Sequence, residues 1–341
     1  MTDPIRVGLM GFGRIGRNVF RQLEKDPSIE VAAIADIADP AALVYLLEFD
    51  TIFGRYPGDV RLDGTNLVVD NREIPMLDGA DPGQVDWGAH DIDIVVQATR
   101  RHRTAAECRR HIEAGASKVV LASTPEDWNE IDTLIVGVND EVLGPDDDVI
   151  ALGSNSSNAL APILQVLDDR FGLDRAMFTV VHAFTNEQRL ADVPGDNLRM
   201  SRAAAENIIP TDTNSPEIVE RALPQLAGKL AGMALNVPVA DGSNIDLVAF
   251  VNTPATVAEL NEAMQAAAEG NEVIGYTDDP IVSSDVIGNR NSALWDGQAA
   301  LVLDETMIKG IVWFDNGWGY AARVVDVIRR MASFTRQGAS S

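Results

Sequence analysis

Cysteine and lysine are scarce in this chain of 341 residues. Its one cysteine, Cys108, excludes an internal disulfide and a metal site built from several cysteines, and we expect no metal. No apolar run reaches the ~18 residues that a membrane helix needs. The opening MTDPIRVGLMGFG lacks the basic flank and apolar stretch of a signal peptide. We therefore expect a cytoplasmic protein that does not act at a membrane.

Positive charge is also in short supply. The 27 basic residues face 52 acidic ones, so the net charge is −25. This excess of negative charge argues against nucleic acid or an anionic membrane surface as a partner. Four lysines against 23 arginines, in so acidic a chain, fit either a salt-rich cytoplasm or a GC-rich genome. At roughly 150 residues per domain, the length suggests two domains.

Strand and helix patterns alternate in the first half of the chain. IRVGLMG, VAAIAD, DIDIVVQAT and SKVVLAS are typical of buried strands, and the segment from Arg17 to Lys25 is typical of a helix. Such alternation predicts an α/β domain with a parallel sheet and right-handed crossovers. Residues 55–77, which contain a DG turn, predict a small antiparallel insertion.

The second half has a different pattern. A helix is expected over residues 159–171, followed by longer strand candidates such as AMFTVVHAF and NIDLVAFVN. This predicts an α+β domain with a mostly antiparallel sheet. Residues 186–207 form a long irregular stretch, and loops of that length are usually functional or part of an interface.

One glycine motif carries the most information about function. It follows a predicted strand, opens a predicted helix and fits G-x-G-x-x-G: Gly11, Phe12, Gly13, Arg14, Ile15 and Gly16. Its glycines permit a tight turn on which a pyrophosphate can rest at a helix N-terminus. Asp36, twenty residues after Gly16, ends the second strand, where a carboxylate accepts hydrogen bonds from ribose hydroxyls. Because Asp36 would repel a 2′-phosphate, NAD is favoured over NADP.

GFGRIGRNVFRQL is more specific than a generic dinucleotide motif and resembles the start of glyceraldehyde-3-phosphate dehydrogenases. HIEAGASKVV, SNALAP, VVHAFTNEQR, LPQLAGKLAGMALNVP and WFDNGWGYAARVVDV resemble segments of that family in the same order. The resemblance implies a Rossmann domain at 1–152 with a returning helix at 316–335, a catalytic domain at 153–315 and a frayed tail at 336–341. It also implies a homotetramer, with residues 186–207 close to a neighbour's cofactor.

The resemblance fails at the position of the catalytic nucleophile. Aligned on Asn158, the chain reads Ser154-Asn155-Ser156-Ser157, so Asn155 stands where the family has its nucleophilic cysteine. An amide forms neither a thiohemiacetal nor an acyl-enzyme, and phosphorylating aldehyde oxidation needs both. Cys108 offers no substitute, because the pattern places it on a helix of the first domain as a packing residue.

Three other candidate catalytic residues have two interpretations each. Ser154 and Ser156 flank the site at a predicted helix start, where a serine could attack with His182 as its base. Helix capping is the simpler interpretation of both serines. His182 matches the family's general base and could accept a proton as an alcohol loses hydride; packing alone would also explain a histidine.

The family's two anion sites are altered as well. Asn236 replaces the substrate-binding arginine and offers neither its charge nor its bidentate geometry. Asn214 replaces a glycine that lets backbone amides reach inorganic phosphate. Thr185, Thr213 and Arg199 are retained. Because these changes accompany the missing cysteine, altered function explains them better than random drift.

The cofactor site is mostly retained. Asn316 matches the asparagine that orients the nicotinamide carboxamide, and Tyr320 matches a tyrosine that packs on the ring. Thr99 is followed by Arg100, which replaces a glycine and begins the basic run ending at Arg103. This run would either bind an anion, interfere with the usual NAD position, or form a solvated helix start.

Two functions remain open. The first is an NAD-dependent oxidoreductase that transfers hydride to or from a small alcohol, aldehyde or imine without a covalent intermediate, with His182 as acid and base. An anionic group on that substrate would meet Arg199 and Thr185. The second is a catalytically inactive homologue that binds NAD or an anion and has a regulatory or assembly role.

Overall fold

The computed structural model describes residues 3–338. Its chain divides into two compact units. The first contains the residues up to Leu134, Asp140–Gly153 and the chain from Ala321 onward, and the second contains Ile135–Asn139 and Ser154–Tyr320.

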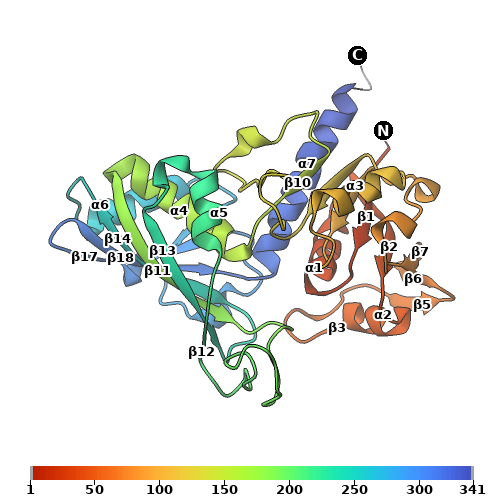
Figure 1. Ribbon diagram of the computed structural model, residues 1–341, viewed down its shortest axis with the longest axis horizontal. Helices are drawn as coiled ribbons and strands as arrows, with labels where there is room; N and C mark the ends of the chain where they lie inside the picture. The colour runs from red at the N-terminus through yellow and green to blue at the C-terminus, as the bar shows by residue number, and fades with distance from the viewer. Residues whose placement is uncertain (1–2, 339–341) are drawn as a thin grey trace. The chain divides into compact units, whose positions relative to one another are not determined.

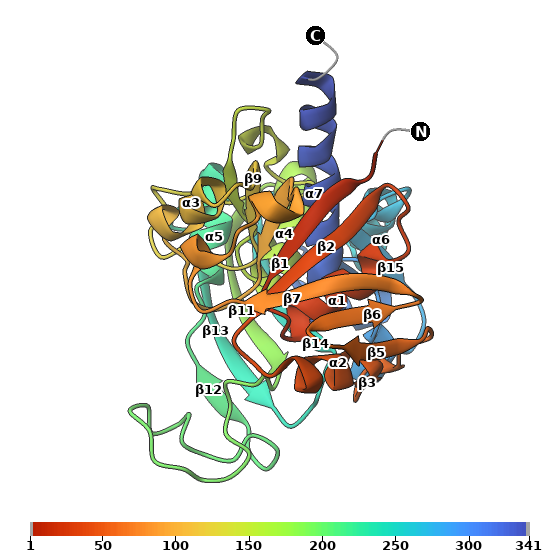
Figure 2. The ribbon, with the colours of Figure 1, turned by 90° about the vertical axis from the view of Figure 1, so that its right-hand side faces the viewer.

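The first unit is built on one eight-stranded sheet. In spatial order its strands are β10 (Val149–Ala151), β9 (Lys118–Leu121), β8 (Ile94–Gln97), β1 (Ile5–Met10), β2 (Ile29–Asp36), β7 (Arg72–Asp78), β6 (Asn66–Val69) and β5 (Val60–Asp63). Strands β10 to β7 run parallel, whereas β7, β6 and β5 pair antiparallel, as expected for the insertion. Figure 2 shows β1, β2, β7 and β6 side by side.

Helices α1 (Arg14–Leu23), α2 (Pro40–Glu48) and α3 (Ala105–Glu113) connect these strands, and β3 (Phe49–Asp50) pairs with β4 (Gly54–Arg55) in a short ribbon. Helix α1 begins three residues before the expected start, because the glycine turn ends at Gly13 and this residue is its N-cap. Short 3₁₀ turns occupy η1 (Pro82–Gln84), η2 (Gly88–His90) and η3 (Asp140–Val142).

The second unit contains the other large sheet. Its order is β12 (Ile209–Thr211), β13 (Leu230–Val237), β11 (Leu173–Ala183), β14 (Ser243–Val251), β18 (Met307–Phe314), β16 (Ala293–Asp296) and β15 (Ile274–Thr277), with β17 (Leu301–Leu303) on β18. Two pairs, β11 with β13 and β15 with β16, are parallel; the other pairs are antiparallel. The predicted fold class, a parallel-sheet α/β domain with a mostly antiparallel α+β domain, is confirmed.

Helices α4 (Asn155–Phe171), α5 (Ser215–Ala222) and α6 (Val257–Ala268) belong to this unit. Helix α4 contacts β11, β14, β16 and β18, and Figure 1 shows α4 and α5 lying along the sheet. Short 3₁₀ turns lie at η4 (Pro224–Leu226), η5 (Ser283–Val286) and η6 (Gly297–Ala299). Residues 186–207 contain turns and bends, with one isolated bridge between Arg189 and Ala203.

Two helices are longer than the sequence indicates. Helix α4 starts at Asn155 rather than at residue 159, because the Ser154 side chain caps it. Helix α7 spans Trp318–Gly338 and so includes residues 336–338, which were expected to fray. The other residues of that expected tail, 339–341, lie outside the described part of the chain.

Candidate functional site

The glycine motif lies where three strand ends meet in the first unit. Strand β1 lies between β2 and β8, so successive parts of the chain add strands on opposite sides of it. Ligands bind open α/β sheets at such a point, where the strand order reverses. Gly11 has a φ of +99°, and a Cβ built there would lie 2.7 Å from Cγ2 of Thr99. A Cβ on Gly16 would lie 2.1 Å from the Gly11 carbonyl oxygen. The motif therefore needs glycine at both positions to form this turn.

The same turn leaves room for a ligand at the start of α1. A Cβ built on Gly13 meets no atom within 4 Å, and no side chain caps the helix there. Backbone N–H groups at such an end attract anions. Nη1 of Arg14 and Nε of Arg17 are buried in the described structure with no hydrogen-bond partner. Open space, uncapped amides and uncompensated donors together fit a pyrophosphate.

Asp36 ends β2 beside this turn. One of its carboxylate oxygens accepts from the Phe12 N–H at 2.7 Å, and the other accepts from the Ala38 N–H at 2.9 Å. The carboxylate is thus held next to the motif at the end of the second strand, which is the position expected for binding ribose hydroxyls.

The basic run after β8 is partly neutralised by the protein itself. His102 Nδ1 lies 3.1 Å from Glu107, and Arg103 pairs with Glu126 at 3.5 Å. Arg100 and Arg101 are exposed. Cys108 is fully buried on α3, where burial raises its pKa to about 12, as expected for a packing residue.

A second constellation lies within the second unit and centres on Asn155, the first residue of α4. Its amide nitrogen donates to the Asn316 carbonyl oxygen at 2.8 Å and lies 3.3 Å from Nε2 of His182. Its amide oxygen accepts from the Ser156 N–H at 2.7 Å. Because a carbonyl oxygen only accepts and an N–H only donates, these partners determine the orientation of the amide.

His182 lies near the end of β11. Its Nδ1 is 2.6 Å from the Ala183 carbonyl oxygen, which can only accept, so Nδ1 carries a hydrogen. The neutral ring then presents an unprotonated Nε2 to Asn155. Phe314 packs edge-on against the imidazole, with ring centroids 6.1 Å apart. Strand β13 places Asn236 directly opposite His182, and this amide is buried.

Asn316 is held from two directions. Its amide oxygen accepts from the buried Ser243 hydroxyl at 3.0 Å, and the same hydroxyl oxygen accepts from the Ala183 N–H at 3.0 Å. Asp315 accepts from the N–H groups of Gly317 and Gly288, which fixes the turn before α7. Tyr320 follows in α7, where burial raises its pKa.

The serines near Asn155 form a hydroxyl chain. Ser154 caps α4 by accepting from the Ser157 N–H, which confirms the capping interpretation for this residue. Ser156 Oγ lies 3.2 Å from Ser154 Oγ and 2.8 Å from Ser215 Oγ. Thr213 extends the chain, donating to Ser215 Oγ at 3.0 Å. None of the hydrogen bonds in the described residues joins Ser154 or Ser156 to His182.

The remaining predicted anion ligands are not all brought together. Thr185 bonds Gln188 through both its N–H and its hydroxyl. Asn214, the N-cap of α5, is exposed and has a φ of −94°, so this backbone needs no glycine. Arg199 is exposed in the long loop, and no hydrogen bond of the described residues joins its side chain to Asn155 or His182.

Sequence reasoning missed Ser215 and Ser243. Ser215 could have been predicted from local sequence, because it is a hydroxyl residue two positions after Thr213 at a helix start. Ser243 had none, because its partners Ala183 and Asn316 are 60 and 73 residues away.

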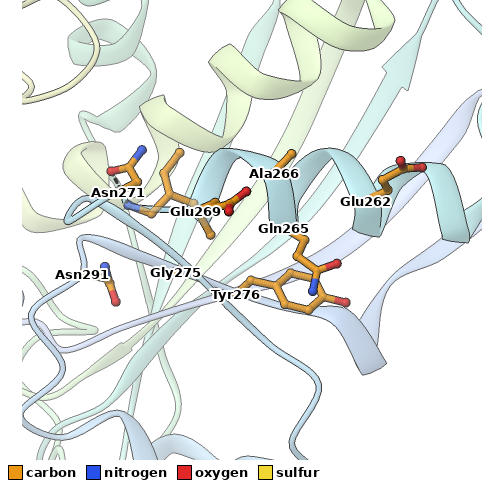
Figure 3. Close-up of a pocket in the computed structure, with 10 residues that line it drawn as sticks. Glu262, Gln265, Ala266, Glu269, Asn271, Gly275, Tyr276 and Asn291 are labelled. Carbon is orange, nitrogen blue, oxygen red and sulfur yellow. Dashed lines mark hydrogen bonds between the residues drawn. The ribbon is translucent and has the colours of Figure 1, made fainter.

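Other parts of the molecule offer less chemistry. A surface cavity of about 670 Å³ lies beside α6 and β15, lined by polar side chains such as Glu262, Gln265 and Tyr276 (Figure 3), and by none of the predicted site residues. No helix among residues 3–338 is both long and apolar enough to cross a membrane. In the same residues, no cluster of three His, Cys, Asp or Glu side chains is arranged to hold a metal ion.

Known proteins resemble the chain over nearly its whole length. The family model for the NAD binding domain of glyceraldehyde 3-phosphate dehydrogenase matches residues 5–105, and that for its C-terminal domain matches residues 154–316. The chain is 43% identical to glyceraldehyde-3-phosphate dehydrogenase 1 of Bacillus subtilis, covering 96% of this chain and 98% of the relative. It is also 43% identical to the glyceraldehyde-3-phosphate dehydrogenase of Geobacillus stearothermophilus, with 96% of this chain and 98% of the relative covered. The enzyme of Mycobacterium avium is 41% identical, over 95% and 97%. The match to the NAD binding domain confirms NAD as the expected cofactor.

Proposed function

The chain belongs to the glyceraldehyde-3-phosphate dehydrogenase family, and from this premise we propose that it transfers hydride between NAD and a small substrate without a covalent enzyme intermediate. The substrate class is an alcohol, aldehyde or imine. Phosphorylating oxidation of glyceraldehyde 3-phosphate is not its reaction, because Asn155 occupies the position of the family's nucleophilic cysteine.

The observation that carries this proposal is the contact between Asn155 and His182. In the family's reaction a thiolate adds to the aldehyde carbon, and an amide nitrogen is no such nucleophile because its lone pair is delocalised. Both N–H groups of Asn155 are directed to acceptors, the Asn316 carbonyl oxygen and His182 Nε2. The amide can orient a substrate by hydrogen bonding, but it forms no bond to carbon.

His182 is the residue suited to move the proton. The Ala183 carbonyl oxygen holds the hydrogen on Nδ1, so Nε2 of the neutral ring is the nitrogen that accepts a hydrogen bond. A substrate hydroxyl that replaces the Asn155 N–H at this atom would donate its proton to Nε2 as hydride leaves the adjacent carbon. In the reverse direction the imidazolium returns the proton to the carbonyl oxygen.

NAD, when bound, would serve as the hydride acceptor in this reaction. The uncapped N-terminus of α1, the glycine turn and Asp36 are the residues suited to bind its pyrophosphate and ribose. Asn316 has the role of binding the nicotinamide carboxamide. Its amide oxygen accepts from Ser243, which leaves the amide nitrogen to donate to a ligand carbonyl.

Recognition of an anionic substrate would be weaker than in the relatives. Asn236 is buried opposite His182 in the sheet register, and its neutral amide lacks the positive charge of an arginine. Thr185, Thr213 and Arg199 remain as candidate ligands. The hydroxyls of Thr213, Ser215 and Ser156 already bond one another, so inorganic phosphate would have to break these bonds.

A serine nucleophile is less well supported. The hydroxyls of Ser154 and Ser156 bond to each other and to Ser157 or Ser215. Attack by serine needs a base within hydrogen-bond distance, and these partners are hydroxyls.

A second candidate function is an inactive homologue that binds NAD and regulates or assembles with other proteins. It is favoured by the same amide, whose N–H is directed at His182 Nε2, the nitrogen that would have to accept the substrate proton. This candidate predicts cofactor binding without turnover.

One experiment separates the two candidates. The protein is incubated with NAD or NADH and a panel of small alcohols, aldehydes and imines, and absorbance is followed at 340 nm. Steady turnover that is lost in His182→Asn and retained in His90→Asn supports the oxidoreductase. Calorimetric NAD binding with no turnover on any panel member favours the inactive homologue.

For assembly, we propose a homotetramer formed through the sheet of the second unit. Four apolar side chains of that sheet are exposed by 42–67%: Met177, Met233, Leu301 and Leu303. Met177 and Met233 lie on the neighbouring strands β11 and β13, and contiguous exposed apolar patches commonly mark interfaces. The loop at residues 186–207 adds exposed Leu190 and Leu198.

A further inference from the structure

A buried line of polar side chains leads to the loop after β8 in the first unit. Trp87 Nε1 donates to His111 Nδ1 at 2.8 Å, and His111 Nε2 lies 3.0 Å from Gln97 Oε1. Gln97 Nε2 in turn donates to Thr99 Oγ1 at 2.7 Å and to the Arg101 carbonyl oxygen at 2.9 Å. Trp87, His111 and Gln97 are fully buried, so water does not compete for these bonds.

The direction of every bond follows from Trp87. An indole nitrogen only donates, so His111 Nδ1 must accept, and the hydrogen of the neutral ring is then on Nε2. That hydrogen is donated to Gln97 Oε1. The amide nitrogen of Gln97 is therefore the group that faces Thr99 and Arg101. Burial keeps the ring neutral, because it lowers the pKa of His111 to about 3.

The end of this line is directed at the cofactor site. The Thr99 methyl group closes on Gly11, where a Cβ would lie 2.7 Å from it, and the Ala98 N–H donates to the Met10 carbonyl oxygen at 2.8 Å. The Thr99 hydroxyl donates to the Arg101 carbonyl oxygen at 2.8 Å, which folds the loop back on itself. The Thr99–Arg101 turn is thus one wall of the glycine turn.

We propose that Trp87, His111 and Gln97 are positioning residues for NAD, which act by holding the Thr99–Arg101 turn against the glycine turn. A reversed Gln97 amide would place its oxygen against the Arg101 carbonyl oxygen, two acceptors without a hydrogen between them. The fixed hydrogen-bond directions from Trp87 to Gln97 exclude this arrangement. The Thr99–Arg101 turn is therefore already ordered before NAD binds, and binding does not bear the free-energy cost of ordering it. The proposal concerns cofactor binding alone and is independent of whether the protein turns over a substrate.

The test is NAD affinity by titration calorimetry in variants that cut the line at different points. Gln97→Met keeps the side-chain length but removes both donors to the turn. Thr99→Val keeps the side-chain shape and removes the hydroxyl, whereas Thr99→Ser keeps the hydroxyl and removes the methyl group. Trp295→Phe is the matched control, because it removes another buried indole hydrogen bond, the one to Asn261 in the second unit.

We expect Gln97→Met and Thr99→Val to weaken NAD binding about fivefold or more, the equivalent of one lost hydrogen bond. Thr99→Ser and Trp295→Phe should bind within twofold of the unchanged protein. Affinity within twofold in Thr99→Val overturns the proposal, and so does equal weakening in Trp295→Phe. Thr99 is only half-buried whereas Gln97 is fully buried, so Thr99→Val should fold even where Gln97→Met does not.

A second measurement determines the tautomer of His111, and with it the direction of the hydrogen bonds from Trp87 to Gln97. Nitrogen-15 NMR of the unchanged protein should show His111 with hydrogen on Nε2 and none on Nδ1. Trp87→Phe removes the donor that sets this tautomer, so the Nδ1–H form should appear and NAD affinity should fall in parallel. An Nδ1–H tautomer in the unchanged protein would overturn the proposal.

Discussion

The amide nitrogen of Asn155 lies 3.3 Å from Nε2 of His182, the ring nitrogen that accepts rather than donates. The contact joins the first residue of α4 to the end of β11, and a further bond ties the same amide to the Asn316 carbonyl oxygen. At this position the chain therefore has a hydrogen-bond donor that cannot become a nucleophile.

The unchanged protein should not oxidise glyceraldehyde 3-phosphate in a phosphate-dependent reaction at 1 s⁻¹ or more, a rate typical of enzymes. Asn155→Cys supplies a thiol beside His182, so it should gain reactivity toward iodoacetamide. Buried Cys108, with its pKa raised to about 12, provides a silent background. Full phosphorylating activity should not return, because Asn236 still lacks the charge of an arginine.

Absorbance at 340 nm with and without phosphate measures the first part, and mass spectrometry of alkylated peptides measures the second. Asn155→Cys combined with His182→Asn is the control, in which alkylation should slow. Phosphate-dependent turnover in the unchanged protein would contradict the assignment of Asn155.

Replacement of Asp36 should weaken NAD binding. Asp36→Ala removes the carboxylate expected to accept from the ribose, which should reduce the binding free energy by about 1.5–3 kcal/mol, the range for a charge-assisted hydrogen bond. Affinity for NADP should be low in the unchanged protein and should change less. Titration calorimetry with both cofactors measures these differences.

Asp78→Ala is a matched control for Asp36→Ala. Asp78 pairs with Asp36 in the sheet register and likewise accepts a backbone N–H two residues ahead, at Ala80. NAD affinity should be unchanged in this variant. Equal affinity of the unchanged protein for NAD and NADP would argue that the basic run at Arg100 has altered the site.

Loss of the α4 cap should affect stability rather than chemistry. Ser154→Ala removes the acceptor for the Ser157 N–H and should lower the free energy of unfolding by about 1 kcal/mol, as for other N-cap serines. Urea denaturation measures the change. If turnover exists, it should persist at a similar rate in Ser154→Ala, whereas complete loss in this correctly folded variant would revive Ser154 as a nucleophile.

Buried His111 should make the protein less stable as the pH falls. Its pKa is about 3 in the folded state against 6.5 for the ordinary residue, so the unfolded chain binds the extra proton between these values. The free energy of unfolding should therefore fall by up to about 1.4 kcal/mol per pH unit from this group as pH decreases from 6.5 toward 3.

The contribution of His111 can be isolated by His111→Gln, which can still accept from Trp87 and donate to Gln97 without titrating. Urea denaturation at pH 7, 5 and 4 should show a shallower pH dependence in this variant. The same slope in both proteins would mean that His111 does not contribute.

Assembly should depend on salt. Four chains of net charge −25 carry about −100, and this repulsion is screened as the Debye length falls from ~30 Å at 0.01 M salt to ~3 Å at 1 M. We expect a tetramer in 1 M salt and dissociation in dilute buffer, measured by light scattering. Met177→Glu on the sheet should dissociate it at both concentrations, while Glu262→Gln on α6 should not.

A monomer at 1 M salt would refute the tetramer. A tetramer equally stable at 0.01 M would refute only the role of charge repulsion.

The sequence by itself determined the fold class, the cofactor and the family. These follow from local patterns: alternating strand and helix periods, a glycine turn whose backbone few other residues can adopt, and Asp36 at a strand end. Each depends on residues close together along the chain. Ser154 as a cap was predictable for the same reason, because an N-cap side chain bonds a backbone N–H only three residues ahead.

Only the tertiary structure decided which distant residues meet. Asn155 begins a helix, His182 lies near the end of a strand and Asn316 lies in the turn before α7. Ser243 joins Ala183 to Asn316 through contacts between distant segments that no local pattern encodes. The line from Trp87 through His111 and Gln97 to Thr99 likewise crosses a 3₁₀ turn, a helix and a strand. Hydrogen-bond direction in such buried networks depends on every partner being present, and therefore on the packed fold.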